Sequence, residues 1–254
     1  MILDCVLTST NNNKLYSGFI PYFIKMWNLL YPEVDVKIIF IGDEIPNEYL
    51  KYEKNLLLFK PLKNISTSFI SQYIRLLYPC LLNYKNGILI TDIDDVPMNK
   101  TYFKNNIKNI PNNKWVNLRD WKTNDEISMC WQVACSQTWK EVFNINSIED
   151  LENRIKTVNN SINYESHDKN GWTTDQVHLK RYIDLWNKKT NNYIFLKDAD
   201  TKFSRLGRNR INNLDKNIKN KITDGFYSDY HCLRPMSEYK DINEEIYKLL
   251  SKLS

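Results

Sequence analysis

Three aspartates follow a short apolar run, and their types and spacing suit metal chemistry. The run begins at Gly87 and ends at Thr91, and Asp92, Asp94 and Asp95 come directly after it. A run this short, bounded by turn residues, is typical of a buried strand in a parallel sheet. Because side chains alternate along an extended chain, we expect Asp92 and Asp94 on one side and a structural Asp95 on the other. Two carboxylates on one side suit a hard divalent cation, Mg²⁺ or Mn²⁺.

The same aspartates allow two other interpretations. One is a solvated turn in which an aspartate caps a backbone N–H. The other is a phosphatase of the haloacid-dehalogenase type, in which Asp92 would attack phosphorus and Asp94 would act as acid and base. That class places its motif after the first strand and needs a later lysine with an acidic cluster. Here two or three predicted strands precede the motif, and residues 197–200 imitate the cluster poorly.

The elements that must position these aspartates alternate between strands and helices. Apolar, β-branched runs predict strands over residues 3–8, 36–41 and 56–59 before the strand that ends at Thr91. Helical spacing of apolar residues predicts helices over residues 19–30 and 68–82. The pattern predicts an α/β fold of the Rossmann-like kind, with a mostly parallel central sheet flanked by helices. Ligands bind beyond the carboxyl ends of such strands.

The second half of the chain is less regular. We expect strands over residues 115–118 and 127–133, and helices over residues 147–158, 175–186 and 242–253. Ser147 with Asp150 three residues later is a capping-box-like helix start. The segment 199–234 is rich in loops and basic residues. We expect a single domain over residues 1–254, with a nucleotide-binding half over about 1–100 and an acceptor-side half over about 101–254.

Composition bounds the class of protein. The chain has 254 residues, 42% hydrophobic and 26% charged, as in an ordinary soluble domain. The net charge of +5 suits an anionic ligand, and we expect no nucleic-acid partner because no such binding motif is present. Five cysteines without zinc spacing indicate reduced thiols. With no predicted membrane span or signal segment, we expect a cytoplasmic protein, and a viral or host-cytosol setting is compatible.

Several short segments together resemble a known family. Arg75-Leu-Leu-Tyr-Pro, a short spacer and the strand ending in Asp-x-Asp resemble the core of GT-A fold glycosyltransferases, most closely the retaining family-eight nucleotide-sugar transferases. Residues 171–176 are similar to the family's Asp-Gln pair at the head of a helix. Residues 230–235 look like a contracted form of its His-then-Lys-Pro segment. The matches follow the family's order over about residues 3–235.

The resemblance implies a nucleotide-sugar donor, usually a UDP-sugar, and a divalent metal, Mn²⁺ or Mg²⁺. It makes Asp92, Asp94 and His231 the metal ligands, and it places Arg75 and Arg234 as positive charges near the diphosphate. The chemical reason is that negative charge grows on the departing diphosphate when the glycosidic bond breaks, and a metal stabilises that charge.

The resemblance also suggests where the rest of the donor binds. Thr8, Ser9 and Asn11 lie in the region that holds the base and ribose, and an ordinary polar loop is the alternative. Asp175 and Gln176 match the Asp-Gln pair and are the catalytic candidates that face the donor sugar or the acceptor. The alternative for this pair is a helix cap, because a threonine precedes Gln176 by three residues.

The chain departs from the family pattern at two places. Arg234 replaces the family's lysine, which still suits phosphate, and the glycine between the histidine and this cation is missing. Residues 130–132 stand where the family has Asn-x-Gly. We expect retention of anomeric configuration, which needs no dedicated base. An inverting enzyme would need a carboxylate as base, for which Asp175 and Asp120 are the candidates.

The remaining expectations concern weaker signals. Tyr16 is a candidate to stack on the base, the basic loop 202–210 is expected to be a solvated surface, and His167 and His178 are expected to be surface or packing residues. The acceptor can be a glycan, a protein or a lipid-linked sugar, and a homodimer is an open alternative. A non-catalytic protein that binds a sugar nucleotide or a glycan is the remaining functional alternative.

Overall fold

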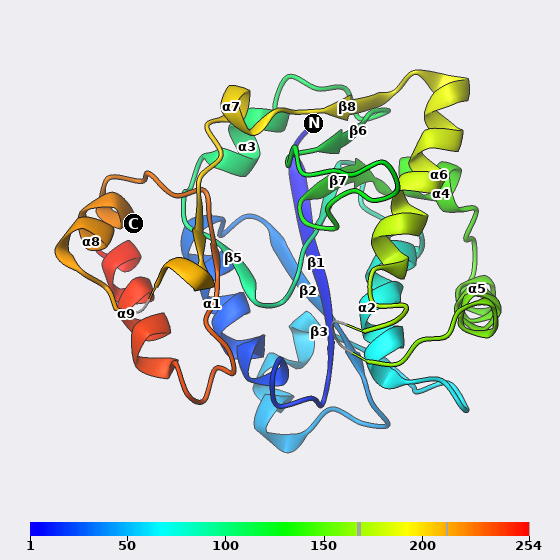
Figure 1. Cartoon of the computed structure of the whole chain (residues 1–254), viewed down its shortest axis with the longest axis horizontal. Coiled ribbons are helices and arrows are strands. Elements are labelled where there is room, and N and C mark those ends of the chain that lie inside the picture. Colours follow the sequence, from blue (N-terminus) through cyan, green and yellow to red (C-terminus); the bar gives the residue numbers. More distant parts are fainter. Residues whose placement is uncertain (167–168, 212, 254) are drawn as a thin grey trace.

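Parallel strands from the first part of the chain form the centre of the molecule (Figure 1). The structure, a computed structural model, describes residues 1–166, 169–211 and 213–253, so the expectation for His167 lies outside the described residues. The strands β1 (Leu3–Asn11), β2 (Asp35–Ile41), β3 (Leu56–Phe59) and β4 (Gly87–Ile90) pair in parallel in the order β3-β2-β1-β4. All four predicted strands are confirmed, to within a few residues at their ends.

Three later strands extend this sheet beyond β4. They are β7 (Gln132–Cys135), β6 (Trp115–Asn117) and β8 (Tyr193–Phe195), and the full order is β3-β2-β1-β4-β7-β6-β8. The pairs β4–β7 and β6–β7 are antiparallel, whereas β6–β8 is parallel. The sheet is therefore mixed but mostly parallel, as predicted. The strand predicted over residues 127–133 is wrong at its start, because residues 127–131 form a loop before β7.

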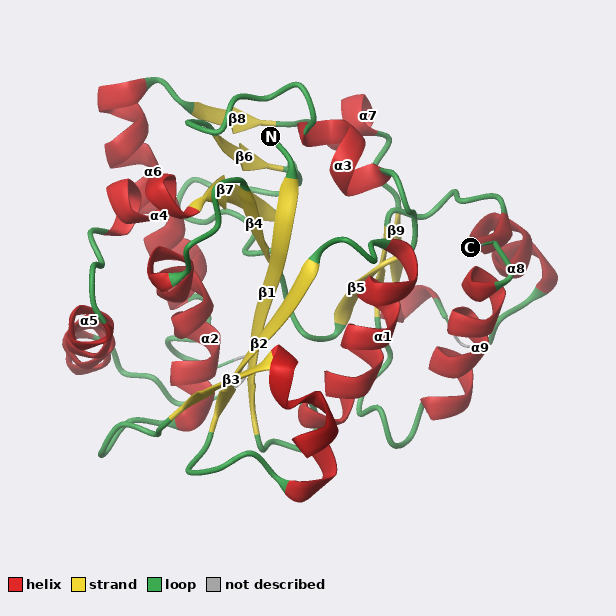
Figure 2. Ribbon diagram, turned by 180° about the vertical axis from the view of Figure 1, so that it is seen from behind, coloured by secondary structure: helices red, strands yellow, loops and turns green. Residues whose placement is uncertain are grey.

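Helices cover both faces of the sheet, as the two views in Figures 1 and 2 show. One buried cluster contains side chains of α1, α3 and α9, and a second contains side chains of α2, α4, α5 and α6. The helices are α1 (Ile20–Leu30), α2 (Thr67–Leu77), α3 (Tyr102–Ile107), α4 (Ser136–Phe143), α5 (Ile148–Ser161), α6 (Thr174–Thr190), α7 (Asp198–Thr201), α8 (Lys216–Thr223) and α9 (Lys240–Ser251). The sequence alone did not predict α3, α4, α7 and α8.

Local sequence signals account for several helix ends. Ser147 and Asp150 form the expected capping box of α5, in which each side chain accepts the other's backbone N–H. The helix predicted over residues 68–82 is too long, since α2 ends at Leu77 and a 3₁₀ turn, Tyr78–Leu81, contains Pro79. Proline lacks the N–H that would continue the α-helix, so the hydrogen-bond ladder stops there.

The central strands are apolar on both faces. In β1, Val6 belongs to the core on the α1 side, and its neighbours Cys5 and Leu7 belong to the core on the α2 side. In β4, Leu89 likewise faces the opposite side from Ile90. Helices on both faces of a parallel sheet require this pattern. Asn11 and Asp92 lie where β1 and β4 end, and there their polar side chains line a pocket.

A second, smaller sheet forms beside the first, and the sequence did not predict it. It consists of β5 (Asp95–Pro97), β10 (Asp229–His231) and β9 (Arg205–Gly207) in the order β5-β10-β9. β10 runs antiparallel to β5, with His231 paired to Asp95, and parallel to β9, with His231 paired to Gly207. This sheet brings the C-terminal basic segment next to the aspartates that follow β4.

The helices also bear on the expectation of no membrane span. Within the described part of the chain, none of them combines the length and the apolar character needed to cross a bilayer.

Candidate active site

A polar pocket of about 370 Å³ lies at the edge where β1 and β4 end. Its walls come from the end of β1 and the segment after it, one side of α2 and the loop after β4. Three later segments, around Trp172, Arg208 and His231, complete them. Both halves of the chain therefore line it. Of the predicted site residues, the lining includes Ser9, Asn11, Arg75, Asp92, Asp94, His231 and Arg234.

Asp94 is the most heavily paired carboxylate of this pocket. Its Oδ2 accepts a hydrogen bond from Arg208 Nη2 at 2.8 Å and one from Arg234 Nη1 at 3.3 Å. His231 Nε2 lies 3.8 Å from the same oxygen. The backbone carbonyl of Asp94 also accepts from the N–H of Cys232 at 2.8 Å, which ties the loop after β4 to the end of β10. One carboxylate thus faces two guanidinium groups and an imidazole.

His231 is a neutral imidazole in this arrangement. Its burial lowers the pKa to about 4, against an opposing effect of Asp94. Arg208 Nη2 is hydrogen-bonded to His231 Nε2, and an arginine can only donate, so Nε2 accepts and the ring proton is on Nδ1. Histidine binds a metal ion as a neutral imidazole, through a ring nitrogen such as Nε2 that has a free lone pair.

Arg75 links the pocket to the interior behind it. Its Nη1 donates to Asp92 Oδ1 and, at 3.3 Å, to the carbonyl of Thr91, and its Nη2 donates to Asp175 Oδ2 at 3.2 Å. Burial opposes the charge of Arg75, but Asp92 and Asp175 outweigh it and raise the pKa. For Asp92 the corresponding burial effect is outweighed by Arg75, which lowers the pKa. Asp92 and Asp94 both line this pocket, so they lie on one side of the chain as expected.

Asp175 lies behind Arg75 and does not line the pocket. It is 1% exposed, and burial raises its pKa to about 6 although Arg75 acts in the other direction. Gln72 Nε2 donates to Asp175 Oδ1 at 3.2 Å, and so does the backbone N–H of Gln176 at 2.9 Å. Gln176 is half-buried next to it at the start of α6. Among the described residues the Thr173 side chain makes no capping hydrogen bond, so the expected Thr173–Gln176 capping box is not formed.

The segment at the end of β1 supplies hydroxyl and amide groups. Ser9 and Asn11 line the pocket, whereas Thr8 is fully buried and does not. Asn11 Nδ2 donates to Thr67 Oγ1 at 3.0 Å, which fixes the amide against the start of α2. Tyr16 also lines the pocket: Arg234 Nη1 donates to its hydroxyl at 2.5 Å, and the guanidinium carbon lies 5.0 Å from the ring centroid.

Asp95 points away from the pocket into a buried cluster, as expected. Arg205 Nη2 donates to Asp95 Oδ2 at 2.5 Å and also bonds Asp229 Oδ2, while Trp131 Nε1 donates to Asp229 at 3.0 Å. Both carboxylates are fully buried and share one arginine. Burial, reinforced by Asp229, raises the pKa of Asp95 far above its ordinary value despite Arg205. The expectation of a solvated basic loop is therefore wrong at Arg205 and Arg208, which bind carboxylates.

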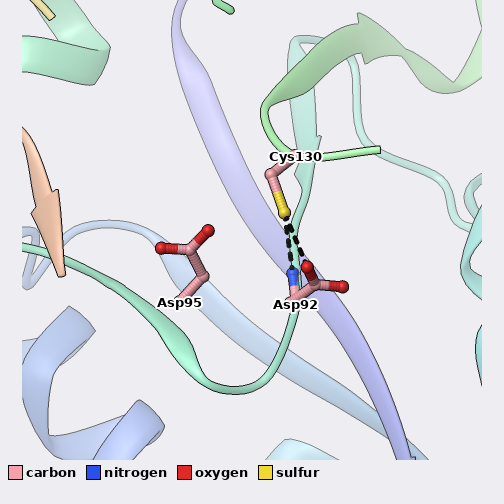
Figure 3. Close-up of side chains that lie close together, drawn as sticks. All are labelled: Asp92, Asp95 and Cys130. Carbon is pink, nitrogen blue, oxygen red and sulfur yellow. Dashed lines mark hydrogen bonds between the residues drawn. The ribbon is translucent and has the colours of Figure 1, made fainter. Parts of the chain in front are cut away.

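Cys130 lies next to two of the aspartates, and together they offer atoms that can bind a metal. Asp92, Asp95 and Cys130 each offer one atom, and these atoms lie within 4.8 Å of one another (Figure 3). In Figure 3 the Cys130 thiol meets Asp92, donating to its Oδ2 at 3.1 Å and lying 3.4 Å from its backbone nitrogen. Burial and the two aspartates raise the pKa of Cys130 well above its usual range. These three residues form an acidic group that could hold a metal.

The pocket contains functional candidates that the sequence did not single out. Arg208 was part of a basic run with no spacing that set it apart from its neighbours. Gln72 and Trp172 meet through a hydrogen bond from the Gln72 amide to the Trp172 carbonyl, a contact between residues 100 positions apart. Asp120, by contrast, is exposed and outside the pocket lining, where its carboxylate accepts from the backbone of Asp198 at 3.2 Å. Helical spacing of Gln72 and Arg75 on α2 was the one signal that could have found Gln72.

The donor set around Asp94 fits a divalent cation. Asp94 and His231 converge to 3.8 Å, and the carboxylate of Asp92 faces the same pocket from two residues earlier. Carboxylate oxygens suit Mg²⁺ and Mn²⁺, and a neutral imidazole favours Mn²⁺ of the two. Asp94 and His231 therefore lie close together, and Asp92 lines the same pocket.

Comparison with known proteins bears on the fold. No protein-family model matches the chain, and no curated protein matches it. Among solved structures, the galactosyltransferase LgtC in complex with donor and acceptor sugar analogues is similar over 98% of this chain and 95% of its own, with 12% sequence identity and a TM-score of 0.50. The glycosyltransferase GlyE of Streptococcus pneumoniae TIGR4 is similar over 99% of this chain and 63% of its own, with 12% identity and a TM-score of 0.52.

These likenesses extend over nearly the whole chain, and at 12% identity they concern the fold. The mixed seven-stranded sheet and the helices on both of its faces belong to this fold. The chain has the GT-A-like fold of these glycosyltransferase structures, as the sequence resemblance predicted.

Proposed function

We propose that this protein is a metal-dependent glycosyltransferase. It moves a sugar from a nucleotide-sugar donor, a UDP-sugar, to an acceptor, and it retains the anomeric configuration. The observation that carries the proposal is the convergence of three arginines, two aspartates and one histidine on a single pocket at the ends of β1 and β4. A pocket with this composition suits a diphosphate, because guanidinium groups bind phosphate oxygens in bidentate fashion.

Asp92, Asp94 and His231 would hold the metal. When bound, the metal neutralises charge on the diphosphate leaving group. This set is favoured over Asp92, Asp95 and Cys130, because Asp95 and Cys130 do not line the pocket and burial raises the pKa of both groups well above the usual range. A thiolate ligand would also favour softer metals such as Zn²⁺.

The other pocket residues divide the donor between them. Arg75 and Arg234 bind phosphate oxygens from opposite ends of the Asp92–Asp94 loop. Ser9 and Asn11 receive the nucleoside, with Thr8 packed beneath them. Tyr16 lies against Arg234 and offers a ring to the base. Held in this way, the donor presents its anomeric carbon to the open part of the pocket.

Asp175 and Gln176 lie at the start of α6, beyond Arg75. Because Asp175 is buried and bonded to Arg75, its role in this proposal is to position that arginine. Gln176 is half-buried at the same helix start and is assigned to the donor sugar or the acceptor. With retention, no residue is needed as a dedicated base, which agrees with the exposed position of Asp120 outside the pocket lining.

The names of the similar structures support sugar transfer over the competing functions. LgtC is described with donor and acceptor sugar analogues, and GlyE is described as a glycosyltransferase. The phosphatase alternative is disfavoured because the aspartates follow β4 and because residues 197–200 do not line the pocket. A binder without turnover has the same pocket and is separated from a transferase by experiment.

The proposal is tested by calorimetry of UDP with and without Mn²⁺. We expect Asp94→Asn to lower the Mn²⁺-dependent UDP affinity at least about a hundredfold. Mutation of a residue that only supports a metal ligand lowers metal affinity about 10- to 100-fold, and Asp94→Asn removes a ligand itself. The matched control is Asp224→Asn, an exposed aspartate after α8, which should bind UDP as the wild type does. Equal UDP affinity for the wild type and Asp94→Asn in the presence of Mn²⁺ would overturn the proposal.

A second measurement separates turnover from binding. The wild type, incubated with a panel of UDP-sugars and Mn²⁺, should release UDP slowly by transfer to water. UDP binding without any release across the panel would favour a non-catalytic binder. Release of inorganic phosphate from a phosphomonoester would favour the phosphatase.

A further inference from the structure

The guanidinium of Arg208 occupies the space between the two residues that would share a metal. Its Nη2 donates to Asp94 Oδ2 at 2.8 Å and is hydrogen-bonded to His231 Nε2. These are the two atoms that lie 3.8 Å apart and face the pocket. Arg208 itself lines the pocket, with a side chain that is 17% exposed.

A metal and this guanidinium cannot occupy the position together. A divalent cation such as Mg²⁺ requires its oxygen ligands at about 2.1 Å, and it uses the same lone pairs of Asp94 and His231 that now accept hydrogen bonds from Arg208. Two cations at that separation also repel each other. Binding of the metal therefore requires the Arg208 side chain to leave.

The backbone of Arg208 is held while its side chain is able to turn. Gly207, directly before it, pairs with His231 in the small sheet, and Arg205 is bonded to Asp95 and Asp229. The segment is thus attached on one side. The guanidinium, attached through a long side chain that lines the pocket, can move from Asp94 to an anion in the same pocket.

We propose that Arg208 is an internal cation that occupies the position of the metal between Asp94 and His231, is displaced when a divalent metal binds, and then pairs with the diphosphate of the donor. This inference rests on the proposed function for its second step. Its consequence is coupling: because the diphosphate takes up the displaced guanidinium, metal and nucleotide each strengthen the binding of the other.

The test measures Mn²⁺ binding in the absence of nucleotide. The electron paramagnetic resonance signal of free Mn²⁺ reports how much of the metal is unbound. We expect Arg208→Gln and Arg208→Ala to bind Mn²⁺ at least about tenfold more tightly than the wild type, because the competing cation is gone. The matched control is Arg210→Gln, which removes the same charge from an exposed position two residues later and should leave Mn²⁺ affinity unchanged. Thermal melts check that each variant is folded.

A second arm adds UDP. In the wild type UDP should tighten Mn²⁺ binding, and in both Arg208 variants this enhancement should be smaller. Unchanged or weaker Mn²⁺ binding in folded Arg208→Gln and Arg208→Ala overturns the inference, as does the absence of Mn²⁺ binding in all variants. Failure of UDP to bind the wild type under any condition overturns the proposed function instead, and the comparison without nucleotide still decides whether Arg208 competes with the metal.

Discussion

Asp94 and Asp95 are neighbours in the chain, yet each lies in a cluster with a different balance of charge. Asp94 lines the pocket and is bonded to two arginines, Arg208 and Arg234. Asp95 faces the interior, where it and Asp229 share one arginine. The pocket cluster thus has an excess of positive charge that suits an anionic ligand. The interior cluster has two carboxyl groups for one arginine, and burial together with Asp229 raises the pKa of Asp95 well above its ordinary value.

The difference shows how one turn serves two purposes. The interior cluster connects β5, β9 and β10 by ion pairs that have no access to a ligand. The pocket cluster has similar partners but borders a cavity, so its arginines are able to exchange a carboxylate for a phosphate. The four predictions below test this contrast.

The largest effect is expected on stability when an arginine is replaced in the interior cluster. Arg205→Met leaves the fully buried carboxyl groups of Asp95 and Asp229 without the arginine that they share, which should lower the free energy of unfolding by about 3–5 kcal/mol. Arg208→Met should cost only about 1 kcal/mol or less, because Asp94 keeps Arg234. Urea unfolding of both variants measures the difference, and an equal loss in the two would contradict the contrast between the clusters.

The two aspartates should differ most in ligand binding. Asp95→Asn keeps the shape of a side chain that lies outside the pocket lining, so UDP affinity with Mn²⁺ should remain within about twofold of the wild type. In the same assay Asp94→Asn should lose at least about a hundredfold. Calorimetry of the two variants side by side measures this, and a similar loss in both would mean that Asp95 belongs to the ligand site.

A third prediction concerns Asp92 and Asp175, which share Arg75 across the wall of the pocket. Asp175 has a folded-state pKa of about 6, above the ordinary 3.8, so between these values the native state keeps a proton that the unfolded state releases. Stability contributed by this group is present below pH 4 and is lost as the pH rises to 6. Relative to Asp175→Asn, the wild type should lose about 2–3 kcal/mol of unfolding free energy over that range.

Denaturant titrations of the wild type and Asp175→Asn at several pH values between 4 and 7 measure this difference. The remaining carboxylates are common to both proteins, so they cancel in the comparison. A constant difference across the range would show that Asp175 has an ordinary pKa in the folded state.

The smallest effect is expected at the edge of the pocket cluster. Tyr16→Phe removes the hydroxyl that accepts from Arg234 but keeps the ring beneath the guanidinium. One hydrogen bond contributes about 0.5–1.5 kcal/mol, so UDP affinity should fall by roughly two- to tenfold. Tyr239→Phe, outside the pocket lining, is the control, and the same calorimetric assay applies. An unchanged UDP affinity in Tyr16→Phe would contradict the proposal that Arg234, held by the Tyr16 hydroxyl, binds the phosphates.

Much of the fold could be predicted because its first part follows local rules. The strands β1 to β4 are short apolar runs, and α1 and α2 have clear apolar stripes, so periodicity alone located them. The strands β5, β9 and β10 could not be found in this way. Each has three residues, too few for any period, and they contain Asp95, Asp229 and the arginine, Arg205, that pairs with both.

The site divides along the same line. Asp92 and Asp94 were identified from their place after a buried strand, and His231 and Arg234 from the order of short motifs. Arg208 could not be separated from the other cations of its loop, because sequence does not say which side chain of a basic run turns inward. The family resemblance placed Thr8 and Asp175 near the ligand, whereas in the structure both are buried and neither lines the pocket.

The sequence by itself determined the parallel strands, the helices that cover them and the point where carboxylates emerge, because these depend on neighbours within a few residues. Only the tertiary structure decided the charge partners. The pairing of β5, β9 and β10 brings Arg205 and Arg208 more than a hundred residues along the chain to Asp95 and Asp94. Ion pairs over such separations depend on how the strands pack, and this packing made one aspartate structural and left its neighbour facing a ligand.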